Sequence, residues 1–373
     1  LSNSTSPFIT SFTTAFFGFG CTEFCASLIS ETAAAVSGLL KKSLSVSLRT
    51  KCVNDSLSGR IDNIGVIERV CIMYHFLINP NSSSGKGIRY WQIIEKELEV
   101  QNISYTADFT QYEGHATELA EEICRKYKGI KNIVVLGGDG TLNEVINGID
   151  NYDEVFLGYI PSGSSNDLAR SLKISKKPLK ALSNVLKPNK FTYLDYGEIT
   201  YHKKEAKSRK FICSSGTGYD ASVCVEVQSS ELKKKLNRFG AGKFVYLALA
   251  IKQLFKVDFL NSTILIDGIK KDHFKNVLLI SGMIHPFEGG GLMMAPGADP
   301  RDGKLNVCLV HGMPRAIVML LLPTIIFGKH IKLKTVKYFK CSSIEIISDR
   351  EAAIHTDGET PAFSSHISIR CIP

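Results

Sequence analysis

Apolar residues follow two alternating patterns from residue 73 onward. Four short apolar runs predict strands, and each precedes a stretch of helical periodicity; the runs lie at 73–78, 103–109, 133–136 and 155–160. The first helical stretch has Ile88, Trp91, Ile94 and Leu98 on one face, at spacings of three or four residues. This alternation predicts a doubly wound, mostly parallel α/β domain at 73–190, with helices on both faces of its sheet.

After about Lys190 the pattern changes to short β-type runs with few helices between them. The runs lie at 191–200, 263–267, 277–281, 305–310, 343–347 and 366–369. The clearest helical stretches are 244–255 and 314–327. We therefore expect a β-rich, β-sandwich-like second domain at 191–373, whose last strand could return to the first domain.

Residues 1–72 differ from the rest of the chain. They are dense in Ser, Thr, Phe and Cys, show no sustained period and begin with Leu. We interpret Met73 as the natural start and residues 1–72 as an extension from an upstream start assignment. A genuine regulatory or targeting arm is the alternative.

Composition limits the class of protein. The 373 residues include 45 Lys and Arg against 36 Asp and Glu, a formal charge of +9, and 44% are hydrophobic. This balance indicates a folded protein of about two domains and excludes collagen, coiled-coil and low-complexity classes. The small positive excess gives weak support for an anionic partner such as a nucleotide or an acidic lipid, and we expect no nucleic acid partner.

Cysteine spacing and hydropathy bear on location. Ten cysteines are present without a CxxC pair, which favours reduced thiols in a cytosolic protein. No apolar run reaches the length of a membrane-spanning helix, so we expect a cytoplasmic protein that associates peripherally with membranes. Two candidate docking segments are Lys233 to Lys235 beside Phe239, and Ile317 to Phe327 with Lys329 and His330. A solvated basic face and a buried core helix are the respective alternatives, and the core helix is favoured for the second segment.

A glycine-rich turn follows the third predicted strand. It reads Gly-Gly-Asp-Gly-Thr-Leu-Asn-Glu at 137–144 and opens a helix. Glycines allow close backbone approach to a phosphate, and amides at a helix start favour negative charge. Asp139 repels phosphate unless a Mg²⁺ ion or a bridging water lies between them. The full octet in this setting favours a nucleotide site over an ordinary tight turn.

Two further turns follow strands of the same predicted sheet. Residues 79–87 read Asn-Pro-Asn-Ser-Ser-Ser-Gly-Lys-Gly, and residues 161–167 read Pro-Ser-Gly-Ser-Ser-Asn-Asp. Neither has the spacing of a Walker A motif, and each alone is compatible with a plain turn or a helix cap. Because the carboxyl ends of parallel strands meet at one sheet edge, we expect the three turns to converge there.

The order of these three motifs resembles the diacylglycerol kinase catalytic domain family, in particular its bacterial soluble lipid kinases. The resemblance runs from about Met73 to the C-terminus, and residues before Met73 have no counterpart in it. The Gly-Gly-Asp-Gly-Thr core is also shared with NAD kinases. The continuation through Gly148 and the Asn-Asp-Leu-Ala-Arg block at 166–170 favour the lipid kinase branch.

The resemblance implies ATP bound across the three turns. The implied nucleotide contacts are Asn79, Lys86, Thr110, Gly137, Gly138, Gly140, Thr141, Asn143, Glu144 and Ser164. Asp139 and Asp167 are implied to orient the γ-phosphoryl group through a water-linked network with a catalytic Mg²⁺. Ser164 stands where the family often has Thr, so the hydroxyl is retained.

Two segments of the second half also resemble the family. Residues 295–305 are similar to its structural magnesium loop, which implies a carboxylate from Asp302 and main-chain carbonyls from about Asp299 and Lys304. The Asp-Gly-Glu at 357–359 resembles the segment with the family's catalytic base, which implies that role for Glu359. Without the resemblance, both segments would be read as ordinary turns.

The expected activity is that of an ATP- and Mg²⁺-dependent lipid kinase, with diacylglycerol the leading acceptor and phosphatidic acid the product. Another alcohol, such as a sphingoid base, an isoprenoid or phosphatidylglycerol, or NAD itself, is the alternative. A regulatory protein that binds ATP without transferring phosphate is the non-enzymatic alternative. Expected partners are ATP and a lipid presented at a membrane surface, and a homodimer is possible.

Overall fold

A computed structural model of the chain describes residues 72–202, 205–229 and 242–373. The first 71 residues and the basic run at 233–235 lie outside the described residues, so the expectations for them stay predictions. The six cysteines within the described ranges are free thiols.

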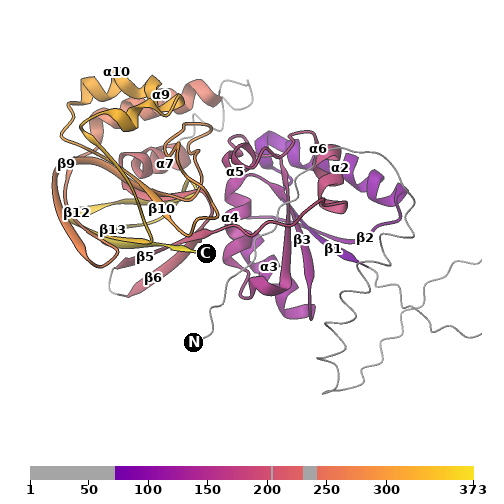
Figure 1. Cartoon of the computed structure of the whole chain (residues 1–373). Helices are drawn as coiled ribbons and strands as arrows, with labels where there is room; N and C mark the ends of the chain where they lie inside the picture. Colours follow the sequence, from indigo (N-terminus) through magenta and orange to yellow (C-terminus); the bar gives the residue numbers. More distant parts are fainter. Residues whose placement is uncertain (1–71, 203–204, 230–241) are drawn as a thin grey trace, which may run out of the picture. The chain divides into compact units, whose positions relative to one another are not determined.

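The first domain is built on a four-stranded parallel sheet (Figure 1). Its strands are β1 (Met73–Ile78), β2 (Ser104–Phe109), β3 (Lys131–Gly137) and β4 (Val155–Pro161), in the order β2-β1-β3-β4. The apolar runs of β1 and β3, the two central strands, are buried on both sides by helices, whereas the edge strand β2 is half-buried to exposed.

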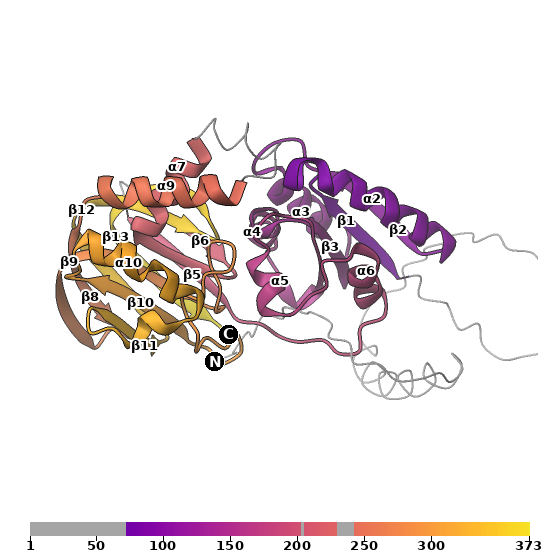
Figure 2. The same ribbon diagram turned by 90° about the horizontal axis from the view of Figure 1, so that it is seen from above.

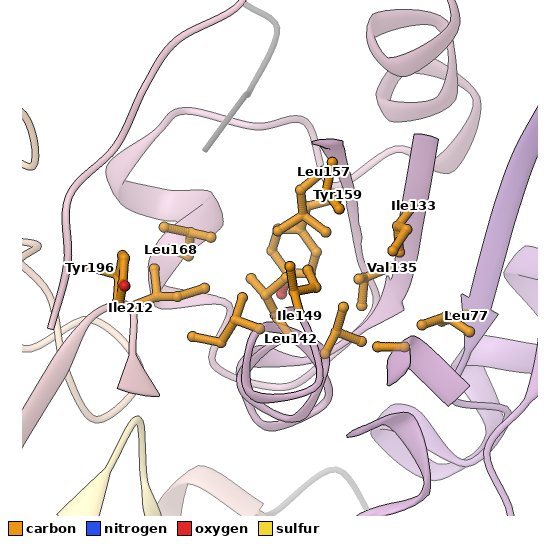
Figure 3. Packing of buried hydrophobic residues seen from close by; sticks show 14 of the residues in the cluster. Leu77, Ile133, Val135, Leu142, Ile149, Leu157, Tyr159, Leu168, Tyr196 and Ile212 are labelled. Carbon is orange, nitrogen blue, oxygen red and sulfur yellow. The ribbon is translucent and has the colours of Figure 1, made fainter. Parts of the chain in front are cut away.

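Helices cover both faces of this sheet. Successive residues of a strand point to opposite faces, and Phe76 packs with α2 (Ser82–Val100) and α6 (Pro178–Leu186), whereas Leu77 packs with α3 (His115–Lys126) and α4 (Asp139–Asn147). Figure 3 shows the hydrophobic core on the face of the sheet covered by α3 and α4, with Leu77, Ile133 and Val135 on the strands facing Leu142. The doubly wound arrangement predicted from the sequence is confirmed.

The second domain is a nine-stranded antiparallel sheet. Its strands are β5 (Tyr196–His202), β6 (Ala206–Phe211), β7 (Ser214–Gly218), β8 (Leu260–Ile266), β9 (Lys270–Met283), β10 (Leu305–His311), β11 (Val336–Cys341), β12 (Ser343–Thr356) and β13 (Glu359–Ile372). The long strands β9 and β12 both pair with β7 over one part of their length and with β8 over another. The β-rich second domain is thereby confirmed.

Within the described ranges of the second domain lie the helices α7 (Tyr219–Ser229), α9 (Gly242–Lys256) and α10 (Arg315–Ile326). Figures 1 and 2 show α9 and α10 side by side in both views. Short helical turns complete the fold, namely α5 (Asp167–Ser171) in the first domain and the 3-10 turns Tyr152–Glu154 and Lys329–Lys332.

The last strand does not return to the first domain. β13 lies between β12 and β5 in the nine-stranded sheet. The reason is the turn at Asp357 and Gly358, both with positive φ, which folds β13 back along β12 as an antiparallel hairpin. This hairpin fixes the position of Glu359 directly after the turn.

Candidate active site

The three turns singled out in the sequence meet at the carboxyl end of the four-stranded sheet. The backbone amide of Asn79 donates to the carbonyl of Leu136 at 2.9 Å, and that of Ser162 donates to the carbonyl of Gly137 at 2.8 Å. The hydroxyls of Ser82 and Ser162 lie 2.6 Å apart. The strand ends therefore hold all three turns together, as their spacing predicts.

The turn at the start of α2 has an unusual backbone. Ser83, Ser84 and Gly85 have φ values of 46°, 59° and 86°, so three successive residues are left-handed. Such a conformation costs a non-glycine residue about 1 to 2 kcal/mol. Strain of this kind persists where the surrounding structure enforces it and is found at ligand-binding sites.

Close backbone packing explains why positions 138 and 163 are glycines. A Cβ atom on Gly163 would lie 2.5 Å from the Cα atom of Gly138, so the second and third turns touch backbone to backbone. A side chain at Gly163 would force the turns apart.

Asp139 of the turn at 137–144 and Asp167 of the turn at 161–167 lie next to each other. The carboxylate of Asp139 accepts a hydrogen bond from the backbone amide of Asp167 at 2.9 Å. The carboxylate of Asp167 accepts one from the backbone amide of Gly290 at 2.7 Å and is paired with Arg170. The pair predicted from two separate motifs is therefore brought together, and a loop of the second domain contacts it.

The electrostatics of this pair suit a divalent cation. Burial, with the charge of Asp167 beside it, raises the pKa of Asp139 to about 7. Burial also raises the pKa of Asp167. The ionised form of each carboxyl group is unfavourable here because the two groups are buried and adjacent. A Mg²⁺ ion bound between them would neutralise that charge and would take their oxygens as ligands.

Glu359 lies against the glycine-rich turn. A Cβ atom on Gly140 would come within 2.7 Å of its Oε1 atom. Its Oε2 atom accepts a hydrogen bond from the side chain of Gln228 at 3.0 Å. The residue implied as catalytic base, which opens β13, thus lies beside Gly140 in the first turn of α4, and Gly140 directly follows Asp139 in the chain.

Asp357 holds the turn that presents Glu359. Its carboxylate accepts hydrogen bonds from the backbone amides of Ile212, Cys213 and Ser214, at 2.7, 2.7 and 3.0 Å. It also accepts one from the side chain of Asn143 on α4 at 2.8 Å. Sequence reasoning placed this carboxylate next to the base but did not identify its anchoring role.

Asn143 is placed differently from its expected role as a nucleotide contact. Its side chain is fully buried, donating to Asp357 and to the carbonyl of Lys210 and accepting from the Arg209 guanidinium at 2.8 Å. The helical rotation from the glycine-rich turn directs position 143 toward the second domain. Its amide therefore joins the two domains.

The remaining implied nucleotide contacts surround the turns in different ways. Asn79 donates from its side chain to the Thr141 hydroxyl at 3.0 Å, and Ser164 lies 3.2 Å from the Ser83 hydroxyl. Thr110 is buried at the end of β2. Lys86 lies on α2 with its ammonium 4.8 Å from the centre of the Tyr90 ring, so in this structure it packs along its own helix.

A cavity of about 550 Å³ opens beside this group. Its lining includes Glu144 and Glu359 from the predicted site, together with Glu113, Thr117 and Arg209. Glu144 also accepts a hydrogen bond from the backbone amide of Ala116 at 3.1 Å, which fixes its position. A cavity of this volume accommodates a small-molecule ligand.

The loop compared with a magnesium site contains a carboxylate that the sequence did not reveal. Asp195 accepts a hydrogen bond from the backbone amide of Gly303 at 2.7 Å and closes the loop. Asp302 binds the ammonium of Lys340 at 2.6 Å, and Asp299 binds Arg301 at 3.0 Å. The amide of Lys304 donates to Asp302 at 3.1 Å. Burial, with the charges of Asp302 and Asp299, raises the pKa of Asp195, whereas Asp302 and Asp299 are each paired with a cationic side chain.

A buried cluster of one histidine and two carboxylates lies on the sheet of the second domain, and the sequence did not reveal it. The Nε2 atom of His355 lies 3.1 Å from the Asp220 carboxylate and 3.4 Å from that of Glu288. Gly216 pairs with His355 in one neighbouring strand and with Ser281 in the other, and a Cβ atom there would meet Asp220 at 3.1 Å. The same Cβ atom would lie 2.5 Å from the Ile280 carbonyl oxygen and 2.9 Å from the Ser281 Cα atom, so the backbone of β9 is the main reason for glycine here.

The buried carboxylates of this cluster determine the charge of His355. Burial by itself lowers the pKa of His355, but the carboxylates of Glu288 and Asp220 outweigh it and raise that pKa to about 9. Burial raises the pKa of Glu288 to about 7. The imidazolium supplies the positive charge that two buried carboxylates require.

The raised pKa of His355 predicts a pH-dependent stability. Stabilisation by the imidazolium is complete below its unfolded pKa of about 6.5 and is lost as the pH rises through about 9. We expect the free energy of unfolding to fall by about 2 kcal/mol between about pH 6 and pH 9.5, as measured by urea denaturation. His355→Gln should flatten this part of the profile.

His75→Gln is the matched control for this experiment. His75 is also buried, but burial lowers its pKa, so it does not titrate in the alkaline range. If the His75 variant and the His355 variant show the same slope, the assignment to His355 is wrong.

Comparison with known proteins places this geometry in a family. The family model described as "Diacylglycerol kinase catalytic domain" matches residues 73–199, and that described as "YegS C-terminal NAD kinase beta sandwich-like domain" matches residues 213–373. A protein of Bacillus subtilis (strain 168) named "Putative lipid kinase YtlR" is 31% identical over 291 residues, covering 77% of this chain and 93% of that protein. The diacylglycerol kinase of Staphylococcus carnosus (strain TM300) is 28% identical, covering 76% of this chain and 87% of that protein.

Solved structures share the fold. A structure titled "A putative diacylglycerol kinase from Bacillus anthracis str. Sterne" superposes with a TM-score of 0.62 at 19% sequence identity, covering 81% of this chain and 94% of that chain. The two-domain fold and these relatives define a lipid kinase, a phosphotransferase with an alcohol as acceptor. The chain belongs to the diacylglycerol kinase family.

Proposed function

We propose that this protein transfers the γ-phosphoryl group of ATP to the hydroxyl of diacylglycerol, with Mg²⁺ as cofactor, to give phosphatidic acid. The observation that carries the proposal is the proximity of Asp139, Asp167 and Glu359 where three phosphate-type turns converge. Each comes from a separate motif, and a protein that only binds nucleotide has no need of a base at position 359.

The turns provide the phosphate site. Backbone amides at the start of α4 and the hydroxyls of Ser83 and Ser164 are donors suited to phosphate oxygens. The cavity lined by Glu144 and Thr117 is the proposed location of the nucleoside.

Asp139 and Asp167 are the proposed ligands of the catalytic cation, directly or through water. Bound there, Mg²⁺ would neutralise charge that develops on the transferred phosphoryl group. Arg170, paired with Asp167, and the amide of Gly290 keep that carboxylate fixed. The loop at 299–304, with Asp195, is the proposed second magnesium site and stabilises the fold of the second domain.

Glu359 is the proposed general base. As the acceptor hydroxyl attacks the γ-phosphorus, the new O–P bond forms, the bond to the β-phosphate oxygen breaks, and Glu359 accepts the hydroxyl proton. Gln228 donates a hydrogen bond to its carboxylate, and the absence of a side chain at Gly140 leaves room for it.

Phosphate transfer from labelled ATP tests the proposal. The purified chain is incubated with Mg²⁺ and with diacylglycerol, sphingosine, undecaprenol or phosphatidylglycerol in mixed micelles, and NAD serves as a soluble control. We expect label in phosphatidic acid, and none when Mg²⁺ is chelated. Label in another lipid would identify that lipid as the acceptor and leave the mechanism unchanged. Label in NAD alone would overturn the assignment to a lipid acceptor.

A further inference from the structure

Helix α10 exposes an apolar face. Among its twelve residues Val318 is buried, while Leu320 is 77% exposed and Ile326 is 52% exposed, and Phe327 just beyond it is 69% exposed. The expectation of a buried core helix is therefore wrong for this side. A helix that is apolar all round is normally covered by protein or lipid, so this face indicates a binding surface.

The polar groups of α10 do not interrupt the face. The guanidinium of Arg315 donates to the carbonyls of Phe255 and Val257, at 2.8 and 2.6 Å, so its charge is directed toward α9. The hydroxyl of Thr324 donates to the carbonyl of Leu321 at 2.6 Å. What remains outward is aliphatic and aromatic surface.

The charged residues of the segment that contains this face have one sign. Residues 304–344 include six lysines and one arginine and no aspartate or glutamate. Lys329, Lys332 and Lys334 follow α10 directly and are exposed, and the ammonium of Lys329 lies 6.0 Å from the centre of the Phe327 ring. An apolar face bordered by cations is complementary to anionic lipid headgroups above acyl chains.

We propose that this surface, the exposed side of α10 with Lys329, Lys332 and Lys334, docks the protein on an anionic phospholipid bilayer. The helix lies in the interface plane and does not span the membrane, because twelve residues extend about 18 Å against about 30 Å of hydrocarbon. None of the helices within the described ranges is long and apolar enough to cross a membrane. The inference rests on the proposed function, whose acceptor is a membrane lipid.

Charge distinguishes a bilayer from a second copy of the chain. A symmetric dimer through this face would place the same three lysines opposite one another, without acids from residues 304–344 to pair with them. An anionic membrane supplies the opposite charge and the apolar layer together.

Vesicle binding tests the docking surface without catalysis. The full chain is sedimented with vesicles of phosphatidylcholine, with and without phosphatidylglycerol. We expect binding that requires phosphatidylglycerol and weakens with salt. Leu320→Asp combined with Phe327→Asp should lower the partition coefficient about 10-fold or more, because two anchoring side chains become anions.

Val100→Asp is the matched control. Val100 ends α2 in the first domain and is also 77% exposed, so this substitution adds the same charge at an equally exposed apolar position and should leave binding unchanged. Replacing Lys329, Lys332 and Lys334 by Gln should weaken binding to the anionic vesicles about fivefold per lysine. This second variant keeps the helix unaltered and so tests the surface independently of α10 folding.

Transfer to a short-chain, water-dispersed diacylglycerol separates the two proposals. We expect the docking variants to phosphorylate it at the wild-type rate. Vesicle binding by the Leu320 and Phe327 variant equal to that of wild type would overturn the docking surface, even if transfer is observed. A dimer in light scattering that this variant dissociates, with vesicle binding unchanged, would overturn it in favour of a second copy. Binding without transfer would overturn only the proposed function.

Discussion

Glu359→Gln should reduce phosphoryl transfer about a thousandfold while leaving ATP binding and the fold intact. Glutamine keeps the shape of the side chain, so it still fits against Gly140 and faces Gln228, but it cannot accept a proton. The measurement is the initial rate of transfer from labelled ATP to diacylglycerol in micelles, beside an ATP-binding titration.

Glu351→Gln is the control for this substitution. Glu351 is exposed on β12, the partner strand of β13, and the same chemical change there should leave the rate unaltered. A Glu359 variant with a rate within a factor of about ten of wild type would remove this residue as the base. The pH–rate profile gives a second readout, since the acidic limb that depends on the base should disappear in the variant.

Asp139→Asn should reduce transfer about a thousandfold or more and should slightly stabilise the fold. The amide oxygen can still accept the hydrogen bond from the Asp167 amide, so the turn is retained. The negative charge that would attract the cation is lost. Because burial and Asp167 raise the pKa of Asp139 to about 7, its ionised form is unfavourable in the folded state, and a neutral side chain removes that cost at about pH 8.

Opposite effects on activity and stability distinguish this prediction from simple unfolding. The measurements are the transfer rate and the urea denaturation midpoint, each at about pH 8. Asp153→Asn, at an exposed position in the turn before β4, is the control and should change neither quantity. Loss of both activity and stability in the Asp139 variant would show that the carboxylate supports the fold and would contradict its assignment to the cation.

The first domain could be predicted from the sequence because its central strands β1 and β3 are buried on both faces. Residues 73–78 form a short apolar run and coincide with β1. By contrast, β7 consists of Ser214, Ser215, Gly216, Thr217 and Gly218 and has no hydrophobic pattern. Its strand identity comes from pairing with β9 and β12, and Gly216 is required by the close approach of the β9 backbone at Ile280 and Ser281. Such tertiary causes leave no local signal.

In the candidate site, too, some residues could be predicted from local sequence and others could not. Asp139, Asp167 and Glu359 could be identified because each lies in a motif at the end of a strand or in a turn. Asp195 and His355 could not, since their function depends on partners far away in the sequence. The bond from Asn143 to Asp357 could not be predicted, because a motif gives the residue type but not the direction of a side chain after the first helical turn.

The contact between Gly140 and Glu359 has a consequence for how related sequences can vary. Glycine at position 140 is expected from phosphate binding alone, yet any side chain there would also displace the carboxylate of Glu359. The two positions therefore act as one unit of covariation. A relative that carries a larger residue at the first should carry a shorter acid, or no acid, at the second, and a change at the glycine alone should alter proton transfer as much as nucleotide affinity.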